Sequence, residues 1–597
     1  MSFDAEGVPY SAQFGDVYHS ADGGPGQSRH VFLGGNQLPQ RWRNRDAYTI
    51  VETGFGLGLN FLETWRALEA DDAGPARLNY VSVENQPFSP QSLAQAHRHW
   101  PEHEARSRAL IDAWPLPLRG YHRLHLAGGR ITLTLLLGDA LACLSQLQAQ
   151  ADAFYLDGFS PARNPDMWSP AVFAQLARIA RPGATLATWS VAGAVREGLA
   201  HAGFQLEKRP GFRGKREMLT GTRIGPMTAL PPSQARALVI GAGLAGSASA
   251  LRLAERGWEV QVLERHAAPA REASGNPLGL CAPLVNIADG ANAQISRAAF
   301  GYAQRHYTRL HSEEDALILQ HGVLRLLRSL QEADRYQPLL EQAYPDTLAR
   351  YLSPSDATTL LGMATSRPGI WFGTGMSLDP ARVCSRQLRH PGIRTVYEST
   401  VSELVSVNGL WHARDDRGSV LAEAEQVVVA AGMGSLAFAP LLRLESVRGQ
   451  ITVLPADPLR TLSCAVSGEG YGMLMRDGRL LIGATFQPGD NDAGLRSEDH
   501  AANMARMEVA LPGLCRNARP DDAQGRVGFR AVTPDRLPIA GEPGPDGLHV
   551  LTGLGARGLA WAPLGAELLA SRMAGDPLPL PADLIAELLP SRFGMGR

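Results

Sequence analysis

The chain has 597 residues, of which 44% are hydrophobic and 19% charged, an ordinary composition for a globular protein. This length exceeds a single hydrophobic core, so we expect several domains. The 57 basic and 59 acidic residues give a formal net charge of −2, which excludes a strong overall attraction to polyanions.

The sequence argues against a membrane protein, a secreted protein and a metal site. It has no run of about 18 apolar residues, the minimum for a membrane span, and no basic-then-apolar leader. Its five cysteines are scattered without a CxxC pair. We therefore expect no metal, no disulfide framework and a reducing, cytoplasmic location.

Strand-like and helical patterns alternate in the first part of the chain. The strand-like runs are residues 47–52, 78–84, 131–137, 153–156 and 184–189. This alternation predicts an α/β, doubly wound domain with a parallel sheet and crossover helices. Residues 225–233 are rich in proline and small residues. We therefore expect a first domain over 1–226, a linker over 227–235 and a second domain over 236–597.

The first glycine-rich turn is Gly54-x-Gly56-x-Gly58, directly after an apolar strand. Such glycines let the backbone approach a nucleoside closely. The GxGxG spacing is typical of doubly wound S-adenosylmethionine-dependent methyltransferases. Glu84 ends the next strand, where a carboxylate can bind both ribose hydroxyls, and Asp139 follows a later strand, where an adenine amino group could be recognised.

Asp157 follows the fourth strand, in a polar loop with aromatic residues. The methyl acceptor of such an enzyme should lie at this strand end. A carboxylate there can bind an amine, favour its deprotonated form or accept its proton. The alternative is an aspartate that only stabilises its own loop.

A basic stretch contains both lysines of the chain, Lys208 and Lys215, together with Arg209, Arg213 and Arg216. Such a cluster could contact phosphates. The simpler alternative is a solvated hairpin.

The second glycine-rich turn is Gly241-x-Gly243-x-x-Gly246, between an expected strand and an expected helix. This context is typical of dinucleotide binding. Glu264 ends the next strand, where it would bind a ribose 2′-hydroxyl and disfavour a 2′-phosphate. The turn alone indicates FAD or NAD without distinguishing them.

Three further segments favour FAD. Residues 426–432 are similar to a late strand and turn of flavoproteins. A glycine-rich loop follows Glu264 and includes Ser274, Gly275 and Asn276. A last turn precedes a helix that we expect from Pro563, whose amino end could stabilise charge on a reduced flavin. That turn contains Gly553, Gly555, Arg557 and Gly558.

Shorter strand-like runs predict a separate, mostly antiparallel substrate domain beside the FAD-binding Rossmann-like domain. They are residues 370–372, 395–397, 401–407, 450–454 and 480–482. Arg530 follows them. Flavin oxidases of amino acids use an arginine here as a bidentate clamp for the substrate carboxylate, and the alternative is a surface salt bridge.

Together these segments resemble the bifunctional tRNA 5-methylaminomethyl-2-thiouridine biosynthesis family. The resemblance covers nearly the whole chain, and the second half alone is similar to glycine oxidase and D-amino-acid oxidase. It is carried by residues 13–18, 31–36, 52–61, 156–168, 241–246, 274–279 and 528–541.

The resemblance implies two steps at the tRNA wobble uridine. The FAD half would remove the carboxymethyl group of 5-carboxymethylaminomethyl-uridine, and the other half would methylate the exposed amine. By motif position, Gly54, Gly56, Gly58 and Glu84 would bind S-adenosylmethionine and Asp157 would orient the amine. Gly241, Gly243, Gly246, Glu264 and Arg557 would serve the flavin, and Arg530 the substrate carboxylate.

Two other functions remain open. An amino-acid or amine oxidase fused to a small-molecule N-methyltransferase would have the same cofactor motifs without RNA. A tRNA-binding or redox-sensing protein could keep both folds without turnover. The basic stretch argues against the first, and the intact motif residues argue against the second. The near-neutral charge fits a tRNA substrate less well, so RNA recognition would depend on local patches such as residues 208–216.

Overall fold

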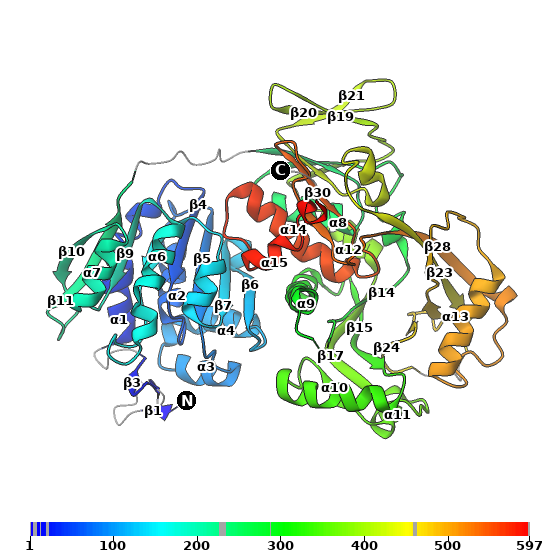
Figure 1. Cartoon of the computed structure of the whole chain (residues 1–597), viewed down its shortest axis with the longest axis horizontal. Helices are drawn as coiled ribbons and strands as arrows, with labels where there is room; N and C mark the ends of the chain where they lie inside the picture. Colours follow the sequence, from blue (N-terminus) through cyan, green and yellow to red (C-terminus); the bar gives the residue numbers. More distant parts are fainter. Residues whose placement is uncertain are drawn as a thin grey trace. The chain divides into compact units, whose positions relative to one another are not determined.

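The computed structural model describes residues 2–3, 9–11, 14–18, 23–225, 235–286, 288–457 and 462–594. The chain divides into two compact units, Met1–Ser233 with Ser571–Asp583 and Gln234–Ala570 with Leu584–Arg597 (Figure 1). Of the predicted linker 227–235, all but Ala235 lies outside the described residues. Within the described ranges, no helix combines the length and the apolar character that a bilayer span requires.

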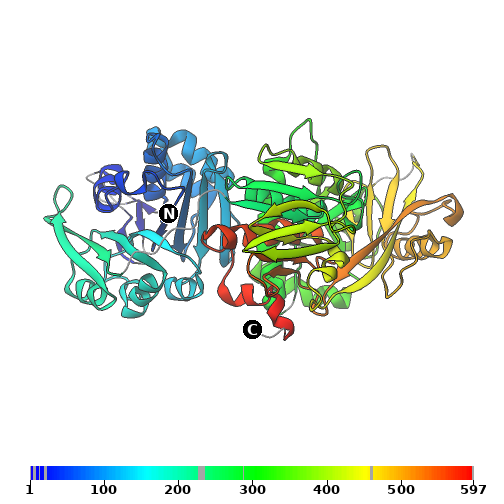
Figure 2. The same ribbon diagram turned by 90° about the horizontal axis from the view of Figure 1, so that it is seen from above.

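An eight-stranded sheet forms the centre of the first unit, in the order β10-β11-β9-β8-β4-β5-β7-β6. Its parallel strands are β4 (Ala47–Glu52), β5 (Arg77–Glu84), β7 (Ile131–Leu137), β8 (Ala151–Tyr155) and β9 (Ala180–Thr188). Antiparallel pairs add β6 (Gly120–Leu126) at one edge and the hairpin of β10 (Phe204–Pro210) and β11 (Glu217–Arg223) at the other (Figure 2). The parallel centre confirms the predicted doubly wound fold.

Both faces of this sheet are buried. Successive side chains of a strand point to opposite sides, and both sides contact hydrophobic clusters. Ile50 and Val51 are neighbours in β4, yet each belongs to a different hydrophobic cluster. The helices that belong to this unit are α1 (Gly24–Ser28), α2 (Leu59–Glu69), α3 (Pro90–His97), α4 (Glu104–Asp112), α5 (Ala140–Gln146), α6 (Pro170–Ile179) and α7 (Gly193–His201). Small strands β1 (Ser2–Phe3), β2 (Pro9–Ser11) and β3 (Asp16–Val17) precede them.

The segment Ser571–Asp583 belongs to the first unit although it comes from the far end of the chain. The carboxylate of Asp576 accepts hydrogen bonds from Arg77 at 2.8 Å and from Asn79 at 3.0 Å. Arg123 on β6 is buried and donates to the hydroxyl of Ser571 at 2.8 Å. A buried guanidinium needs such partners to offset its desolvation. The sequence analysis did not anticipate this return of the chain.

The second unit contains a six-stranded sheet in the order β18-β13-β12-β22-β30-β29. Its parallel strands are β18 (Ile393–Val396), β13 (Glu259–Leu263), β12 (Arg236–Ile240), β22 (Gln426–Val429) and β30 (Leu548–Thr552), and β29 (Ile539–Gly541) is antiparallel. The helices α8 (Leu244–Ala254), α12 (Pro380–Leu388) and α14 (Gly558–Ala574) follow β12, β17 and β30 in the chain. This arrangement confirms the predicted Rossmann-like domain.

A ten-stranded sheet forms the substrate domain. Its strands are β14 (Gly279–Cys281), β15 (Ile318–Leu326), β16 (Arg350–Leu352), β17 (Gly369–Leu378), β23 (Glu445–Leu454), β24 (Ala465–Ser467), β25 (Tyr471–Leu474), β26 (Leu480–Gly483), β27 (Gln487–Pro488) and β28 (Gln524–Val532). Among the described pairs only β15 with β24 is parallel, so the prediction of a mostly antiparallel sheet is confirmed. The remaining helices are α9 (Ala291–Leu310), α10 (Leu330–Ala343), α11 (Pro354–Leu361), α13 (Ser497–Ala510) and α15 (Ala582–Ala586).

Two of the short predicted strands belong to other sheets. Residues 395–397 fall on β18, which pairs in parallel with β13 of the nucleotide-binding sheet. Residues 401–407 fall on β19 (Glu403–Val407), which forms a separate three-stranded sheet with β20 (Leu410–Arg414) and β21 (Val420–Ala424). Local sequence predicts an extended segment, but its partner is decided by tertiary packing.

Candidate active and cofactor sites

The first glycine-rich turn connects β4 to α2 at the carboxyl end of the parallel sheet. Gly56 and Gly58 have φ angles of 53° and 76°, a region that favours glycine. A Cβ atom on Gly54 would lie only 3.0 Å from the carbonyl oxygen of Asp157. These positions therefore require glycine, which lets the turn pack closely between β4 and the strand end that carries Asp157.

Glu84 at the end of β5 lies against this turn. Its carboxylate accepts hydrogen bonds from the backbone N–H groups of Gly56 at 2.8 Å and Gln86 at 2.7 Å. Burial raises the pKa of Glu84, and these backbone donors oppose that shift. Asp139 follows the neighbouring strand β7 and is exposed, with its carboxylate capping α5 through the N–H of Ala142 at 2.9 Å. The two predicted acids thus lie at adjacent strand ends.

Asp157 is part of a hydrogen-bond network at the carboxyl end of β8. The Asn60 side-chain amide donates to the Asp157 carboxylate at 2.7 Å and to the Glu52 carboxylate at 2.9 Å. The N–H of Gly158 also donates to Asp157 at 2.9 Å, and the hydroxyl of Ser82 donates to Glu52 at 2.7 Å. The sequence analysis quoted the segment that contains Glu52 and Asn60 but assigned neither a role in this network.

The two carboxyl groups of this network differ in pKa. Burial raises the pKa of the Glu52 carboxyl to about 8, and the nearby Asp157 charge adds to that shift. Burial raises the pKa of Asp157 to about 6, while the hydrogen bond from Asn60 opposes it. Glu52 is therefore the more readily protonated of the two carboxyl groups. Environments that separate the pKa values of two acids are a common feature of catalytic sites.

The basic stretch divides into two parts. Lys215 lies in the turn between β10 and β11, and its ammonium is 3.5 Å from the centroid of the Trp189 ring. Burial lowers the pKa of Lys215, and the charges of Asp16 and Asp157 oppose this shift. Lys208, by contrast, forms an exposed ion pair with Glu217 at 2.7 Å. Lys215 thus interacts electrostatically with Asp157, whereas Lys208 is paired with Glu217.

Aromatic residues of the N-terminal segment cover the loop after β8. The ring centroid of Phe159 is 4.6 Å from that of Phe14 and 5.2 Å from that of Tyr18. Tyr18 also packs edge-on against Phe88 at 5.1 Å. A Cβ on Gly56 would lie 3.3 Å from the Tyr18 ring, so this tyrosine borders the glycine-rich turn. The sequence analysis used residues 13–18 only as part of the resemblance.

The second glycine-rich turn connects β12 to α8 in the other unit. Gly241 has a φ of 100°, and a Cβ on it would lie 2.8 Å from the carbonyl oxygen of Ala430. A Cβ on Gly246 would collide with the Gly241 carbonyl, and Gly243 is the N-cap of α8. The dinucleotide fingerprint requires glycine at these positions because the backbone packs this closely.

Glu264 and the Ser274 loop lie against the same turn. The buried Glu264 carboxylate accepts hydrogen bonds from the N–H groups of Ala242 at 2.7 Å and His266 at 2.9 Å. The hydroxyl of Ser274 accepts from the N–H of Leu244 at 3.1 Å, in the first turn of α8. The neighbouring Gly275 ends a short 3-10 helix (Ala273–Gly275), and the Asn276 side-chain oxygen accepts from Arg526 at 3.3 Å.

The last glycine-rich turn lies between β30 and α14, where Gly553 and Gly555 have φ angles of 70° and 53°. α14 begins at Gly558, so the predicted start at Pro563 was wrong. A proline inside a helix frees the carbonyl four residues earlier. Here the hydroxyl of Tyr307 donates to that carbonyl, on Leu559, at 2.7 Å. The helix therefore continues through the proline.

Arg530 lies on β28, opposite Val447 of β23, and is half-buried. Its guanidinium donates to the Thr485 carbonyl at 3.3 Å, and a Cβ on Gly449 would collide with it. Burial lowers the pKa of Arg530, while Tyr471 opposes that shift. Within the described residues Arg530 forms no ion pair with a carboxylate, so the alternative of a surface salt bridge has no support.

Arg557 precedes α14 and is also half-buried. Burial lowers its pKa, and the nearby charges of Arg325 and Arg536 lower it further. It therefore belongs to a group of guanidinium side chains and adds positive charge beside the last glycine-rich turn.

Two cofactor-binding α/β folds in one chain define a methyltransferase joined to an oxidoreductase. A family model described as FAD dependent oxidoreductase matches residues 236–572, and one described as S-adenosyl-L-methionine-dependent methyltransferase matches residues 101–224. The chain belongs to the family of tRNA 5-methylaminomethyl-2-thiouridine biosynthesis bifunctional proteins. Its cofactors are accordingly FAD and S-adenosylmethionine.

The relatives cover the full chain. The protein of this name from Azoarcus sp. is 45% identical over 99% of this chain and 97% of its own length. That from Thiobacillus denitrificans is 42% identical over the same shares. Among solved structures, iminodiacetate oxidase from Chelativorans sp. covers 60% of this chain and 99% of its own, with 24% identity and a TM-score of 0.51. L-Proline dehydrogenase from P. horikoshii covers 61% and 99%, with 19% identity and a TM-score of 0.51. These two likenesses concern the fold alone.

Proposed function

We propose that this chain converts 5-carboxymethylaminomethyl-(2-thio)uridine at the tRNA wobble position to the 5-methylaminomethyl form. The FAD-dependent unit removes the carboxymethyl group, and the S-adenosylmethionine-dependent unit methylates the resulting primary amine. The observation that carries the proposal is the opposite charge of the two substrate sides. The first unit offers the carboxylate of Asp157, which suits an amine, and the second offers the guanidinium of Arg530, which suits a carboxylate.

In the oxidative step, Arg530 binds the carboxylate of the carboxymethyl group through paired hydrogen bonds. This contact aligns the methylene carbon beside the nitrogen. FAD would supply the hydride acceptor for that carbon, and addition of water to the resulting imine would release glyoxylate and the primary amine. The turns that contain Gly241, Glu264 and Gly553 would hold FAD, and Arg557 adds positive charge at the last turn.

In the methylation step, the amine must be neutral to attack the methyl group of S-adenosylmethionine. Asp157, more readily ionised than Glu52, accepts a hydrogen bond from the amine and takes up its proton. The Lys215 cation near Asp157 disfavours a second positive charge, so it lowers the proton affinity of the bound amine. Glu84 and Asp139 would bind the ribose and adenine of the cofactor.

We propose that the residues of the basic stretch contribute differently to the RNA contact. Lys208 and Arg209 form exposed ion pairs with Glu217 and Glu207 at 2.7 and 2.9 Å, which reduces their attraction for phosphate. Lys215, Arg213 and Arg216 are exposed at the turn of the hairpin and are the further candidates. The five cysteines are buried free thiols, which supports a reducing, cytoplasmic location.

The test is nucleoside analysis of tRNA that carries the carboxymethylaminomethyl group, after incubation with the purified protein. We expect 5-aminomethyl-uridine species without S-adenosylmethionine and 5-methylaminomethyl species with it. Unchanged tRNA together with turnover of free amino acids or amines would instead support an oxidase fused to a small-molecule methyltransferase. Unchanged tRNA and unchanged small substrates would support a protein without turnover.

A further inference from the structure

The first unit contains a cavity between the α1 segment and the β10–β11 hairpin. The cavity has a volume of about 690 Å³, within the ~300–1,000 Å³ range of small-molecule sites. α1 (Gly24–Ser28) and the following π-helix (Arg29–Gly34) form one wall, and the hairpin forms the other. Its principal side chains are Arg29, His30, Arg209, Phe212, Arg213 and Met218.

The two walls are held together at the aromatic end of the cavity. His30 Nε2 lies 3.0 Å from the carbonyl oxygen of Pro210. The His30 and Phe212 ring centroids are 5.8 Å apart. A Cβ on Gly26 would lie 2.7 Å from the Phe212 ring, so only glycine admits this approach. The ring is therefore fixed at the wall of the cavity and can support a stacked base.

The other property of the cavity is positive charge. Three arginines line it, and none of the lining residues in the described part of the chain is acidic. Two of these arginines also form ion pairs with acidic side chains outside the lining, Arg29 with Glu63 and Arg209 with Glu207. The Arg213 guanidinium lies 5.3 Å from the Phe212 ring centroid. Guanidinium groups next to an aromatic ring are the combination that single-stranded nucleic acid sites use, since one binds phosphate and the other stacks a base.

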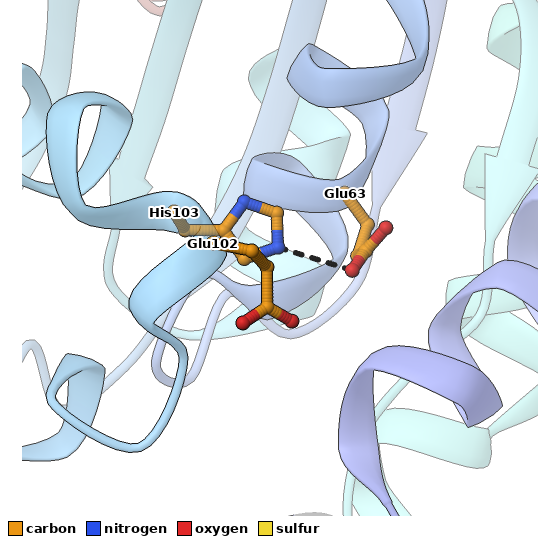
Figure 3. A group of neighbouring side chains, drawn as sticks. All are labelled: Glu63, Glu102 and His103. Carbon is orange, nitrogen blue, oxygen red and sulfur yellow. Dashed lines mark hydrogen bonds and ion pairs between the residues drawn. The ribbon is translucent and has the colours of Figure 1, made fainter.

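Arg29 is held in place by an ion-pair network that includes a buried carboxylate. It donates to the buried carboxylate of Glu63 at 2.8 Å, and Arg66 donates to the same carboxylate at 2.9 Å. His103 Nε2 lies 3.0 Å from Glu63, as Figure 3 shows. The ligand atoms of Glu63, Glu102 and His103 lie within 4.8 Å of one another, but two guanidinium groups on Glu63 disfavour a metal ion there. The network fixes Arg29 at the cavity.

The cavity and the acceptor site share one turn of the hairpin. The N–H of Lys215 donates to the carbonyl of Phe212 at 3.1 Å, and the Lys215 ammonium lies on Trp189 near Asp157. Phe212 thus faces the cavity while Lys215, three residues on, faces the site of methyl transfer. A strand that presents one base to Asp157 would have its neighbouring nucleotide close to the cavity.

We propose that this cavity binds a nucleotide of the RNA strand next to the modified uridine, with its base against Phe212 and its phosphate facing the arginines. The proposal rests on the proposed function, which makes RNA the substrate. Through this local pocket, rather than through a broad basic face, a chain of near-neutral charge would select RNA.

The test uses the full chain and an anticodon stem-loop RNA. We expect Arg213→Gln to weaken stem-loop binding about 3- to 10-fold and to reduce the salt dependence of log Kd by about 1. Phe212→Leu keeps an apolar side chain but removes stacking, so we expect a loss of about 5-fold or more. The matched control is Arg108→Gln, an exposed arginine paired with Glu104 in the same unit. The affinity for S-adenosylmethionine reports folding of each variant.

A second experiment, crosslinking, uses the wild-type protein and so does not depend on how a variant folds. A stem-loop with a photoreactive nucleotide next to the wobble uridine should crosslink within residues 209–218 or 26–34. Crosslinks only elsewhere, or variants that bind S-adenosylmethionine and also bind the stem-loop with wild-type affinity and salt dependence, overturn the proposal. Uridine monophosphate that binds as tightly as the stem-loop would identify a free-nucleotide site and also overturn it. If the wild-type protein did not bind the stem-loop, the proposed tRNA function itself would be contradicted.

Discussion

The two glycine-rich turns of the chain hold their acids in the same way, whereas the proposed substrate-binding side chains of the two units differ in charge. In the first unit Glu84 accepts a hydrogen bond from the N–H of Gly56, and in the second Glu264 accepts one from Ala242, at 2.8 and 2.7 Å. Beyond the turns, one unit presents the carboxylate of Asp157 and the other the guanidinium of Arg530. The two turns thus share one backbone arrangement, and in the proposed function the reaction of each unit follows from the charge that meets its substrate.

The largest expected effect is that of Asp157→Ala. It removes the group that accepts the amine proton, so we expect methylation to fall about 10²- to 10⁴-fold. The oxidative step should continue, because its residues lie in the other unit. Nucleoside analysis should show accumulated 5-aminomethyl-uridine species. Asp166→Ala, an exposed aspartate of the same loop, is the control. Loss of both activities, or of neither, would contradict separate sites.

Arg530→Ala tests the opposite side of the comparison. Loss of a charge-assisted contact to the substrate carboxylate should lower kcat/KM of the oxidative step about 10²-fold. Methylation of tRNA that already carries the aminomethyl group should not change. The exposed Arg519, replaced by alanine, serves as the control. If the Arg530→Ala variant oxidised the carboxymethylamino nucleoside at the wild-type rate, Arg530 would not be the group that binds the substrate carboxylate.

The two lysines of the chain form a matched pair for a smaller effect. Lys215→Gln removes an exposed cation of the proposed RNA contact, so KM for tRNA in methylation should rise about 5- to 10-fold. Lys208→Gln removes a cation that an exposed carboxylate already pairs, so its KM should stay near the wild-type value. Steady-state kinetics at two salt concentrations checks both. Equal effects of the two replacements would mean that the stretch acts only through its total charge.

The smallest expected effect is a shift of the pH profile. Because burial raises the pKa of Asp157 to about 6, this group is protonated below that pH, and kcat of methylation should rise as the pH increases through about 6. Asn60→Ala removes a hydrogen bond that favours the ionised form, so this limb should move about one unit or less toward higher pH. Ser82→Ala, which removes a donor to Glu52 only, should move it less. A limb that stays in place in Asn60→Ala would exclude Asp157 as the titrating group.

Sequence patterns predicted much of the fold because they report local burial and local turns. Five strands of the first sheet, the two cofactor turns and the antiparallel substrate domain were all predicted from such patterns. The assignment of residues 395–397 to the substrate domain was wrong, since β18 pairs with β13. A strand four residues long carries no information about which sheet will accept it.

The site shows the same division between local and distant information. Glu52 and Asn60 lie in the quoted motif, but their bond to Asp157 joins residues about a hundred positions apart, so only the folded chain displays it. The position of Lys215 on Trp189 depends on a hairpin that folds back over the sheet end. The roles of the individual site residues remain predictions.

The sequence by itself determined the cofactor classes and the order of the two units, because glycine spacing and strand-end acids are local features that backbone chemistry requires. Tertiary structure alone decided that Asn60 links Glu52 and Asp157, that one lysine of two lies near Asp157, and that residues 571–583 complete the first unit. These features depend on long-range packing, which brings together side chains whose positions in the chain give no sign of their contact.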